Sequence, residues 1–207
     1  MTGHALATVF IIEDDSSIRE GLACLFNSVD LNVETFPNGN KFLDGFNLYQ
    51  HGCLIIDIRM PGMSGLELQE YLAQSGNHMP IIMITGHADI AMAVRAMKAG
   101  AFDFIMKPFN SQFLLERVQQ AIKLDKKRIN AHQHILLAHG LKQLTARELE
   151  VLELITSGKL NREISNLLGI SMSTVEMHRA NIMKKMHATS IAGLVKNYLI
   201  LKSGIFL

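Results

Sequence analysis

The chain has little of what stabilises secreted or membrane proteins. Only two of its 207 residues are cysteines, Cys24 and Cys53, and both thiols are expected to pack as small apolar side chains rather than to pair in a disulfide. No apolar run approaches the roughly 20 residues that a membrane-spanning helix needs. The first fifteen residues, MTGHALATVFIIEDD, lack the basic start of a signal peptide. We therefore expect a cytoplasmic protein with no membrane partner.

What is present is the composition of a globular protein with an uneven distribution of charge. Hydrophobic residues make up 48% of the chain and charged residues 19%, and the length suits one large domain or two ordinary ones. Residues 1–110 carry 12 acids and 6 bases, a net charge of −6, whereas residues 111–207 carry 7 acids and 14 bases, a net charge of +7. This asymmetry indicates two domains with different partners, and the basic one could meet nucleic acid.

The first 110 residues alternate between apolar runs and helix-like stretches. Strands are expected at TVFII, LNVETF, CLIID, PIIMIT and FDFIM, with helices such as SSIREGLACLFNSV and ADIAMAVRAMKAG between them. Strand–helix alternation favours a parallel sheet covered by helices on both faces, and near-continuous apolar strands fit a sheet buried on both sides. The fold class predicted here is a doubly wound α/β fold with a five-stranded parallel sheet.

Polar residues stand where these strands end. The first strand runs into Glu13 and Asp14, the third ends at Asp57, the fourth at Thr85, and the fifth runs into Lys107. In a parallel sheet the carboxyl ends of the strands meet at one edge, where ligands bind. Crowded carboxylates repel, and oxygen ligands of this kind suit Mg²⁺. A carboxylate can also attack phosphorus and form an acyl phosphate, whose charge a lysine and a hydroxyl would then stabilise. A lone strand-end aspartate is usually a helix cap or loop anchor. The prediction of a Mg²⁺ and phosphoryl site therefore rests on the whole group of strand-end residues and not on Asp57 by itself.

Residues 111–138 contain neither proline nor glycine and are expected to form one helix, with Ser111 able to cap its start. The helix begins with an apolar stripe and becomes charged, which predicts a last helix of the first domain that extends into a linker ending near Gly140. A basic run at residues 123–128 is either a solvated face or lies near a DNA backbone. The HQH triplet at 132–134 lacks metal-ligand spacing and is read as a solvated face.

The last 65 or so residues show no strand alternation and predict four helices. Thr145 followed by Glu148 is a capping box, and Gly169-Ile170 makes a tight turn between two helices. The remaining helices are expected to begin at Asn161, at Ser171 or Ser173, and at Ser190. A short helix, a glycine turn and a longer helix form the helix-turn-helix pattern.

The third of these helices has two faces at 100° per residue. Val175, His178, Ile182 and Met186 form the core side, while Ser173, Glu176, Met177, Ala180 and Lys184 lie opposite. In a helix-turn-helix the outer face enters the major groove, where Glu176 could accept from cytosine N4, and Met177 and Ala180 could touch thymine methyl groups. Lys184, Lys185 and Arg162 are expected to meet phosphates. The alternative is a solvated polar face on an ordinary helix bundle.

The stretches IIEDD, LIIDIRMPGMSG, IIMITGHAD and FDFIMKPF resemble the receiver domain of two-component response regulators, which has a flavodoxin-like fold. The resemblance implies that Asp57 is the phosphoacceptor. It further implies that Asp14 binds Mg²⁺ directly, that Glu13 binds it through water, and that the Arg59 backbone carbonyl is a third ligand. Thr85 and Lys107 are implied to hold the phosphoryl group, and Phe104 to turn inward when Thr85 moves. Lys107-Pro108 is expected to be cis, and Asp15 to cap a helix.

The stretches LTARELEVLELITSG, NREISNLLGIS and TVEMHRANIMKKM resemble a LuxR-type output domain, so the whole chain looks like a NarL/FixJ-family regulator of the FixJ-like branch. The domains expected are a receiver at 1–123, a linker helix at 124–140 and a DNA-binding domain at 141–207. Many relatives carry a basic residue at the position of Glu176, and an acid there is expected to lower nonspecific affinity for DNA. The implied DNA-binding residues are Arg162, Ser173, Thr174, Glu176, Met177, Arg179, Ala180, Lys184 and Lys185.

The function expected is a regulator switched by phosphoryl transfer from a sensor histidine kinase, with a homodimer binding double-stranded operator DNA. One rival is a haloacid-dehalogenase-type phosphatase, which also uses a strand-end aspartate with Mg²⁺. Such enzymes need a second aspartate two residues on as general acid, and here that position is Arg59. The other rival is an interaction module whose basic half binds RNA or protein.

Overall fold

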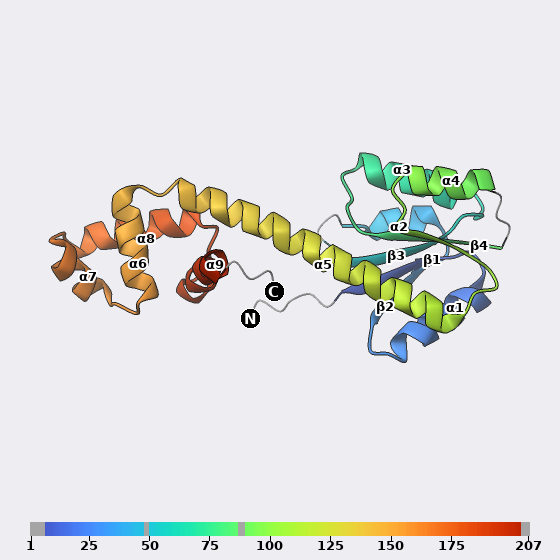
Figure 1. Ribbon diagram of the computed structural model, residues 1–207, viewed down its shortest axis with the longest axis horizontal. Helices are drawn as coiled ribbons and strands as arrows, with labels where there is room; N and C mark the ends of the chain where they lie inside the picture. Colours follow the sequence, from blue (N-terminus) through green and yellow to red (C-terminus); the bar gives the residue numbers. More distant parts are fainter. Residues whose placement is uncertain (1–6, 48–49, 87–89, 204–207) are drawn as a thin grey trace. The chain divides into compact units, whose positions relative to one another are not determined.

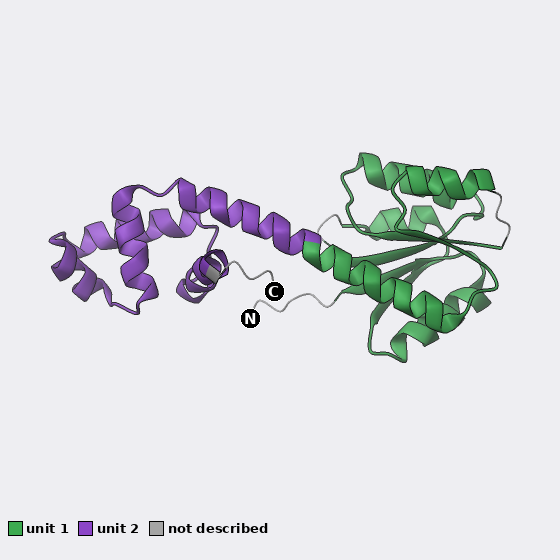
Figure 2. Ribbon diagram, viewed as in Figure 1, with its two compact units in different colours: residues 1–127 green, residues 128–207 purple. Residues whose placement is uncertain are grey.

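The computed structural model describes residues 7–47, 50–86 and 90–203 of the chain. Two compact units are present, residues 1–127 and residues 128–207 (Figure 2). The boundary between them falls inside one helix, α5 (Ser111–Lys142). Residues 124–127, which the sequence placed in a linker, belong to the first unit.

The first unit contains a five-stranded parallel sheet with the strand order β2-β1-β3-β4-β5. The strands are β1 (Thr8–Ile12), β2 (Asn32–Phe36), β3 (Gly52–Asp57), β4 (Ile81–Thr85) and β5 (Asp103–Met106). β1, β3 and β4 are almost entirely buried, as expected of parallel strands covered on both faces. The predicted doubly wound parallel fold is therefore confirmed.

Helices cover both faces of this sheet (Figure 1). Val9 and Ile11 point to the face covered by α1 (Ser16–Asn27) and α5, while Phe10 and Ile12 point to the other face. The second face is covered by α2 (Gly39–Gly45), α3 (Gly65–Gln74) and α4 (Ile90–Lys98). Successive strand residues alternate between two apolar cores, so the sheet leaves its polar residues for the strand ends.

The helix starts follow local capping chemistry. Asp15 caps α1 and accepts hydrogen bonds from the backbone N–H groups of Ser17 and Ile18, as predicted. The prediction of Ser111 as the cap of α5 is wrong. Asn110 has this role, because its side chain accepts from the Phe113 N–H at 3.0 Å. The cap therefore lies one residue earlier than the sequence pattern indicated.

A buried carboxylate ends the part of α5 that packs on the sheet. Leu114, Val118 and Ala121 form its buried stripe, and Asp125 occupies the next position with 6% of its surface exposed. Asp125 accepts a hydrogen bond from the backbone N–H of Gly52, the first residue of β3, at 2.9 Å. A side chain at Gly52 would collide with the Thr8 carbonyl, and its φ of 145° favours glycine. This bond attaches α5 to the strand that carries Asp57.

The second unit contains the end of α5 and four further helices, as predicted. They are α6 (Ala146–Thr156), α7 (Asn161–Leu168), α8 (Met172–Lys185) and α9 (Ile191–Ser203). The capping box of Thr145 and Glu148 is confirmed, and Ser171 rather than Ser173 caps α8. Gly169 ends α7 in the left-handed conformation at φ 63°, so α7, a tight turn and α8 form the helix-turn-helix.

Candidate functional site

Three carboxylates converge at the carboxyl ends of β1 and β3. Ile12 and Ile56 pair in neighbouring strands, so the residues that follow them, Glu13 and Asp57, arrive at the same edge. Glu13, Asp14 and Asp57 each offer an oxygen, and these oxygens lie within 4.8 Å of one another. Glu13 and Asp57 are buried and Asp14 is exposed. Burying like charges this closely costs free energy unless a cation compensates.

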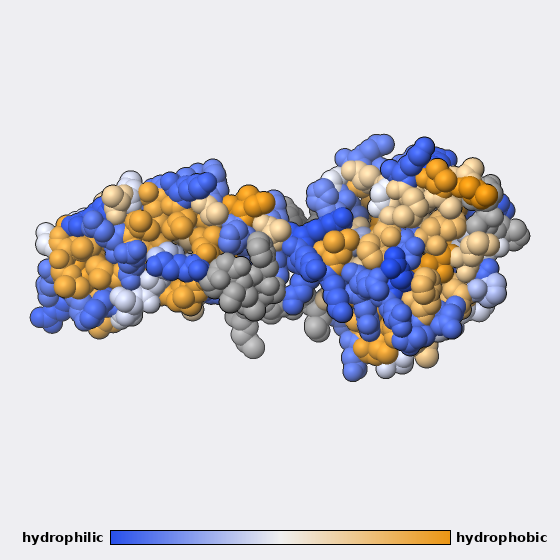
Figure 3. Space-filling model, viewed as in Figure 1, coloured by the Kyte–Doolittle hydropathy of each residue, from blue (hydrophilic) through white to orange (hydrophobic). Residues whose placement is uncertain are grey.

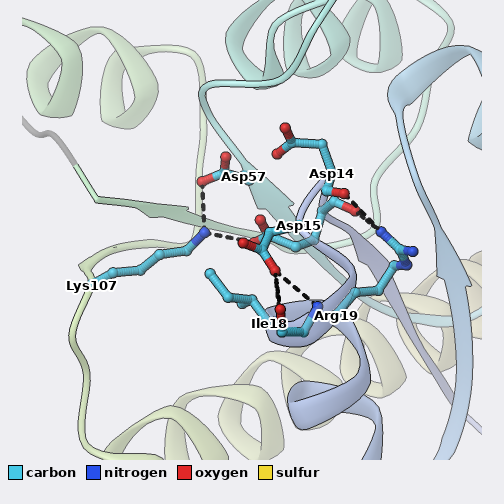
Figure 4. A network of polar contacts seen from close by, with 8 residues as sticks. Asp14, Asp15, Ile18, Arg19, Asp57 and Lys107 are labelled. Atoms are coloured by element: carbon cyan, nitrogen blue, oxygen red, sulfur yellow. Dashed lines mark hydrogen bonds and ion pairs between the residues drawn. The ribbon is translucent and has the colours of Figure 1, made fainter.

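Lys107 supplies one compensating charge. It follows β5, and its Nζ atom lies 2.7 Å from Glu13 Oε2. The same atom lies 3.2 Å from Asp57 Oδ1 (Figure 4). Its backbone N–H donates to the Thr85 carbonyl at 2.8 Å, which fixes the start of the side chain. The structure thus brings together four of the predicted residues, Glu13, Asp14, Asp57 and Lys107. The sequence did not reveal that Lys107 bridges two of the carboxylates.

Burial and charge shift the protonation of this site. Burial raises the pKa of Asp57 above its usual range, and the nearby Lys107 ammonium offsets part of that rise. Burial also raises the pKa of Glu13, although the hydrogen bond from Lys107 lowers it in part. Burial alone would lower the pKa of Lys107, but its contacts with both carboxylates raise it, which keeps the ammonium charged. The pKa is therefore raised at both buried carboxylates, chiefly because burial disfavours their charged form.

The other predicted receiver residues lie around this cluster. The backbone of Arg59 is a minor influence that lowers the pKa of the Asp57 carboxyl against the larger effect of burial, while the metal contact through the Arg59 carbonyl stays a prediction. Thr85 ends β4 with a fully buried side chain, and Phe104 is half-buried in β5 against the core beneath α3 and α4. The peptide bond between Lys107 and Pro108 is cis, as predicted. Residues 87–89 of the IIMITGHAD stretch lie outside the described residues.

The donor set fits a magnesium ion. All three side chains offer carboxylate oxygens, the ligand type that Mg²⁺ prefers, and one of them remains exposed to solvent. Within the part of the chain that the structure describes, this cluster contains no nitrogen or sulfur ligand of the kind that selects zinc. Glu13, Asp14 and Asp57 are therefore an acidic cluster typical of a Mg²⁺ site.

The second candidate region is the outer face of α8. Val175, Ile182 and Met186 are fully buried and His178 is half-buried, in agreement with the predicted core face. The opposite face is exposed, and it comprises Ser173, Glu176, Met177, Ala180 and Lys184, while Thr174 and Arg179 are half-exposed at its edges. Arg162 is exposed on α7. The predicted base-reading side chains are therefore available to a ligand, although their contacts with DNA stay a prediction.

Lys185 differs from the other predicted phosphate contacts. Its Nζ atom lies 2.7 Å from Glu148 Oε2, and the Glu148 side chain is 4% exposed. The same carboxylate oxygen accepts the backbone N–H of Thr145 at 2.8 Å. Lys185 thus ties the end of α8 to the start of α6. Sequence reasoning recognised the cap but not this ion pair, because residues 37 positions apart gave no local signal.

Comparison with known proteins places both units. Residues 9–119 match the response regulator receiver domain, and residues 142–197 match the bacterial regulatory proteins of the luxR family. The chain is 44% identical to the response regulator protein TodT of Pseudomonas putida, over 92% of this chain and 84% of that protein. It is 40% identical to the transcriptional regulatory protein FixJ of Azorhizobium caulinodans, over 91% of this chain and 90% of FixJ.

Solved structures give the same result. The response regulator StyR is 46% identical with a TM-score of 0.64, and the match covers 94% of this chain and 99% of StyR. Full-length FixJ from B. japonicum is 33% identical with a TM-score of 0.55, and the match covers 95% of this chain and 98% of FixJ.

The protein belongs to the response regulators of two-component systems. More particularly, it is a member of the group whose receiver domain is joined to a LuxR-type DNA-binding output domain, as in FixJ. This is a family of transcription factors and not of catalytic enzymes, and membership implies a histidine kinase partner and DNA binding. None of the helices that the structure describes combines the length and apolar character that crossing a bilayer demands.

Proposed function

We propose that Asp57 is the phosphoacceptor of this response regulator. One observation carries the proposal: Asp57 ends a buried strand with its carboxylate 3.2 Å from the Lys107 ammonium and close to two further carboxylates. In the reaction, an Asp57 carboxylate oxygen attacks the phosphorus of a phosphohistidine on a sensor kinase. The phosphorus–nitrogen bond breaks, its electron pair stays on the imidazole nitrogen, and Asp57 becomes an acyl phosphate.

The surrounding residues stabilise the charge of this transfer. Glu13, Asp14 and Asp57, with the Arg59 carbonyl, would hold Mg²⁺, which when bound supplies positive charge to the phosphoryl oxygens. Lys107 would form an ion pair with the phosphoryl group on Asp57, because its ammonium already contacts the Asp57 oxygen. The Thr85 hydroxyl would donate to a phosphoryl oxygen, and Phe104 would turn inward as Thr85 moves.

The rearrangement would favour a homodimer through the face formed by α4, β5 and the start of α5. Large apolar side chains are exposed there, with Ile90 at 85%, Met106 at 56% and Phe113 at 48%. The orange atoms over α4 in Figure 3 belong to this face. Burial of such a patch against a second copy is a common way to stabilise a two-fold dimer. A dimer would then match an operator with two half-sites.

The output unit would read DNA with α8 in the major groove. Glu176, Met177 and Ala180 are exposed on its outer face for base contacts, and Ser173, Thr174 and Arg179 flank them. Lys184 and Arg162 would contact phosphates. Lys185 would support α8 through Glu148, since that ion pair already engages its ammonium.

The phosphoacceptor is tested by replacing Asp57 with asparagine, which keeps the shape and removes the nucleophile. Wild type incubated with acetyl phosphate and Mg²⁺ should gain the mass of one phosphoryl group, and Asp57→Asn should not. Asp14→Asn is a useful comparison, because it removes a proposed metal ligand while Asp57 remains and should slow labelling rather than abolish it. Equal labelling of wild type and Asp57→Asn would refute the assignment.

A further inference from the structure

Arg19 holds the main chain that carries the acidic pair. It is the fourth residue of α1, and its Nη1 atom donates to the carbonyl oxygen of Glu13 at 2.7 Å. The same atom donates to the carbonyl oxygen of Asp14 at 3.1 Å (Figure 4). Both acceptors are backbone oxygens and neither is a carboxylate. A guanidinium beside an acidic site is thus used to fix the backbone, and the carboxylates of Glu13 and Asp14 stay available to other partners.

Two further contacts complete the support of this loop. The Asp15 side chain accepts from the backbone N–H groups of Ser17 at 2.8 Å and Ile18 at 3.1 Å, and the N–H of Glu13 donates to the Phe36 carbonyl at 3.1 Å. Residues 13–15 are therefore held by α1 on one side and by β2 on the other. Among the residues that the structure describes, Arg19 is the side chain that donates hydrogen bonds to the carbonyl oxygens of both metal-binding candidates.

We propose that Arg19 is a positioning residue of the acidic site, which sets Glu13 and Asp14 at the separation from Asp57 that a divalent cation requires. The inference rests on the proposed function, namely that this site holds Mg²⁺. An arginine suits the task because a single planar nitrogen with two hydrogens serves two carbonyls, whereas a lysine is shorter and strongly hydrated. Partners that orient metal ligands typically contribute 10- to 100-fold to metal affinity.

The test compares four full-length proteins: wild type, Arg19→Met, Arg19→Lys and Lys41→Met. Methionine keeps much of the apolar stem and removes the donors. Lys41 is an exposed cation on α2 whose nearest acid, Asp44, is 3.5 Å away, so Lys41→Met reproduces the change in net charge without the contacts. Calorimetric titration with Mg²⁺ should show a dissociation constant raised about tenfold in Arg19→Met, less in Arg19→Lys, and unchanged in Lys41→Met.

A second measurement separates positioning from general damage. The rate of phosphorylation by acetyl phosphate is followed against Mg²⁺ concentration, with urea unfolding of each variant measured in parallel. Positioning predicts that Arg19→Met needs about tenfold more Mg²⁺ for half the maximal rate and recovers the wild-type rate at saturation. An unchanged Mg²⁺ requirement, with or without a lower rate throughout, overturns the inference. Failure of wild type itself to bind Mg²⁺ would instead overturn the proposed function, and this inference with it.

Discussion

The ion pair between Glu148 and Lys185 makes a quantitative prediction about the DNA-binding unit. Glu148→Ala removes two interactions of one carboxylate oxygen, the bond from the Thr145 N–H at 2.8 Å and the bond from Lys185 Nζ at 2.7 Å. Loss of a helix cap costs about 1 kcal/mol, and loss of a hydrogen bond to a charged group about 1.5–3 kcal/mol. The Lys185 side chain is 30% exposed and can turn to water, so the larger penalty of a stranded buried charge is largely avoided. We expect Glu148→Ala to destabilise the unit by about 2–4 kcal/mol.

Hydrogen exchange of the full-length chain, read by mass spectrometry on peptides from α6 and α8, measures this free energy without interference from the receiver. Glu150→Ala is the matched control, because Glu150 lies on the same helix in an exposed pair with Arg147 at 2.6 Å. Such a pair contributes less than about 1 kcal/mol. If the two substitutions had equal effects, the ion pair would not support α8 and the reasoning would fail.

The pH dependence adds an independent check. Burial by itself would raise the pKa of Glu148, but the hydrogen bonds from Lys185 and Thr145 together lower it below its ordinary value of 4.5. A lowered pKa means that the stabilisation is fully present above pH 4.5 and is lost as the pH falls through the folded-state pKa. The difference in stability between wild type and Glu148→Gln should therefore shrink below pH 4.5.

Two further predictions concern DNA reading and the anchor of α5. Glu176→Ala should change the preferred base at one position of a selected operator by about 1–3 kcal/mol, whereas Lys184→Ala should weaken all sequences alike and lower the salt slope by about one unit. A base-specific effect of Lys184→Ala, with no effect of Glu176→Ala, would mean that α8 presents a different face. Asp125→Leu should destabilise the receiver by about 1–3 kcal/mol, because it leaves the Gly52 N–H without this acceptor, and Asp125→Asn should cost less. Urea unfolding, with hydrogen exchange of β3, measures the stability of the two Asp125 variants. Equal destabilisation by Asp125→Leu and Asp125→Asn would show that the hydrogen bond to Gly52 is unimportant.

The sequence by itself determined the parallel sheet, the helical second unit and the meeting of Glu13, Asp14 and Asp57. These features follow from local patterns, because continuous apolar runs specify buried parallel strands, and strands of one direction must end at one edge. Capping by Asp15 and Thr145 was predictable for the same reason, since a cap acts within one turn of its helix. The burial of Val175, Ile182 and Met186 followed from helical periodicity.

Only the tertiary structure decided which polar partners these residues take. Lys107 bridges Glu13 and Asp57, Asp125 reaches Gly52, Lys185 reaches Glu148, and Arg19 binds carbonyls rather than carboxylates. The Asp125 and Lys107 contacts join residues 50 to 94 positions apart, and their geometry depends on how helices pack on the sheet. Arg19 is close in sequence, but its acceptors could be distinguished only once the loop conformation was known. Long polar side chains have many rotamers, so the fold and not the local sequence selects the contact that each one makes.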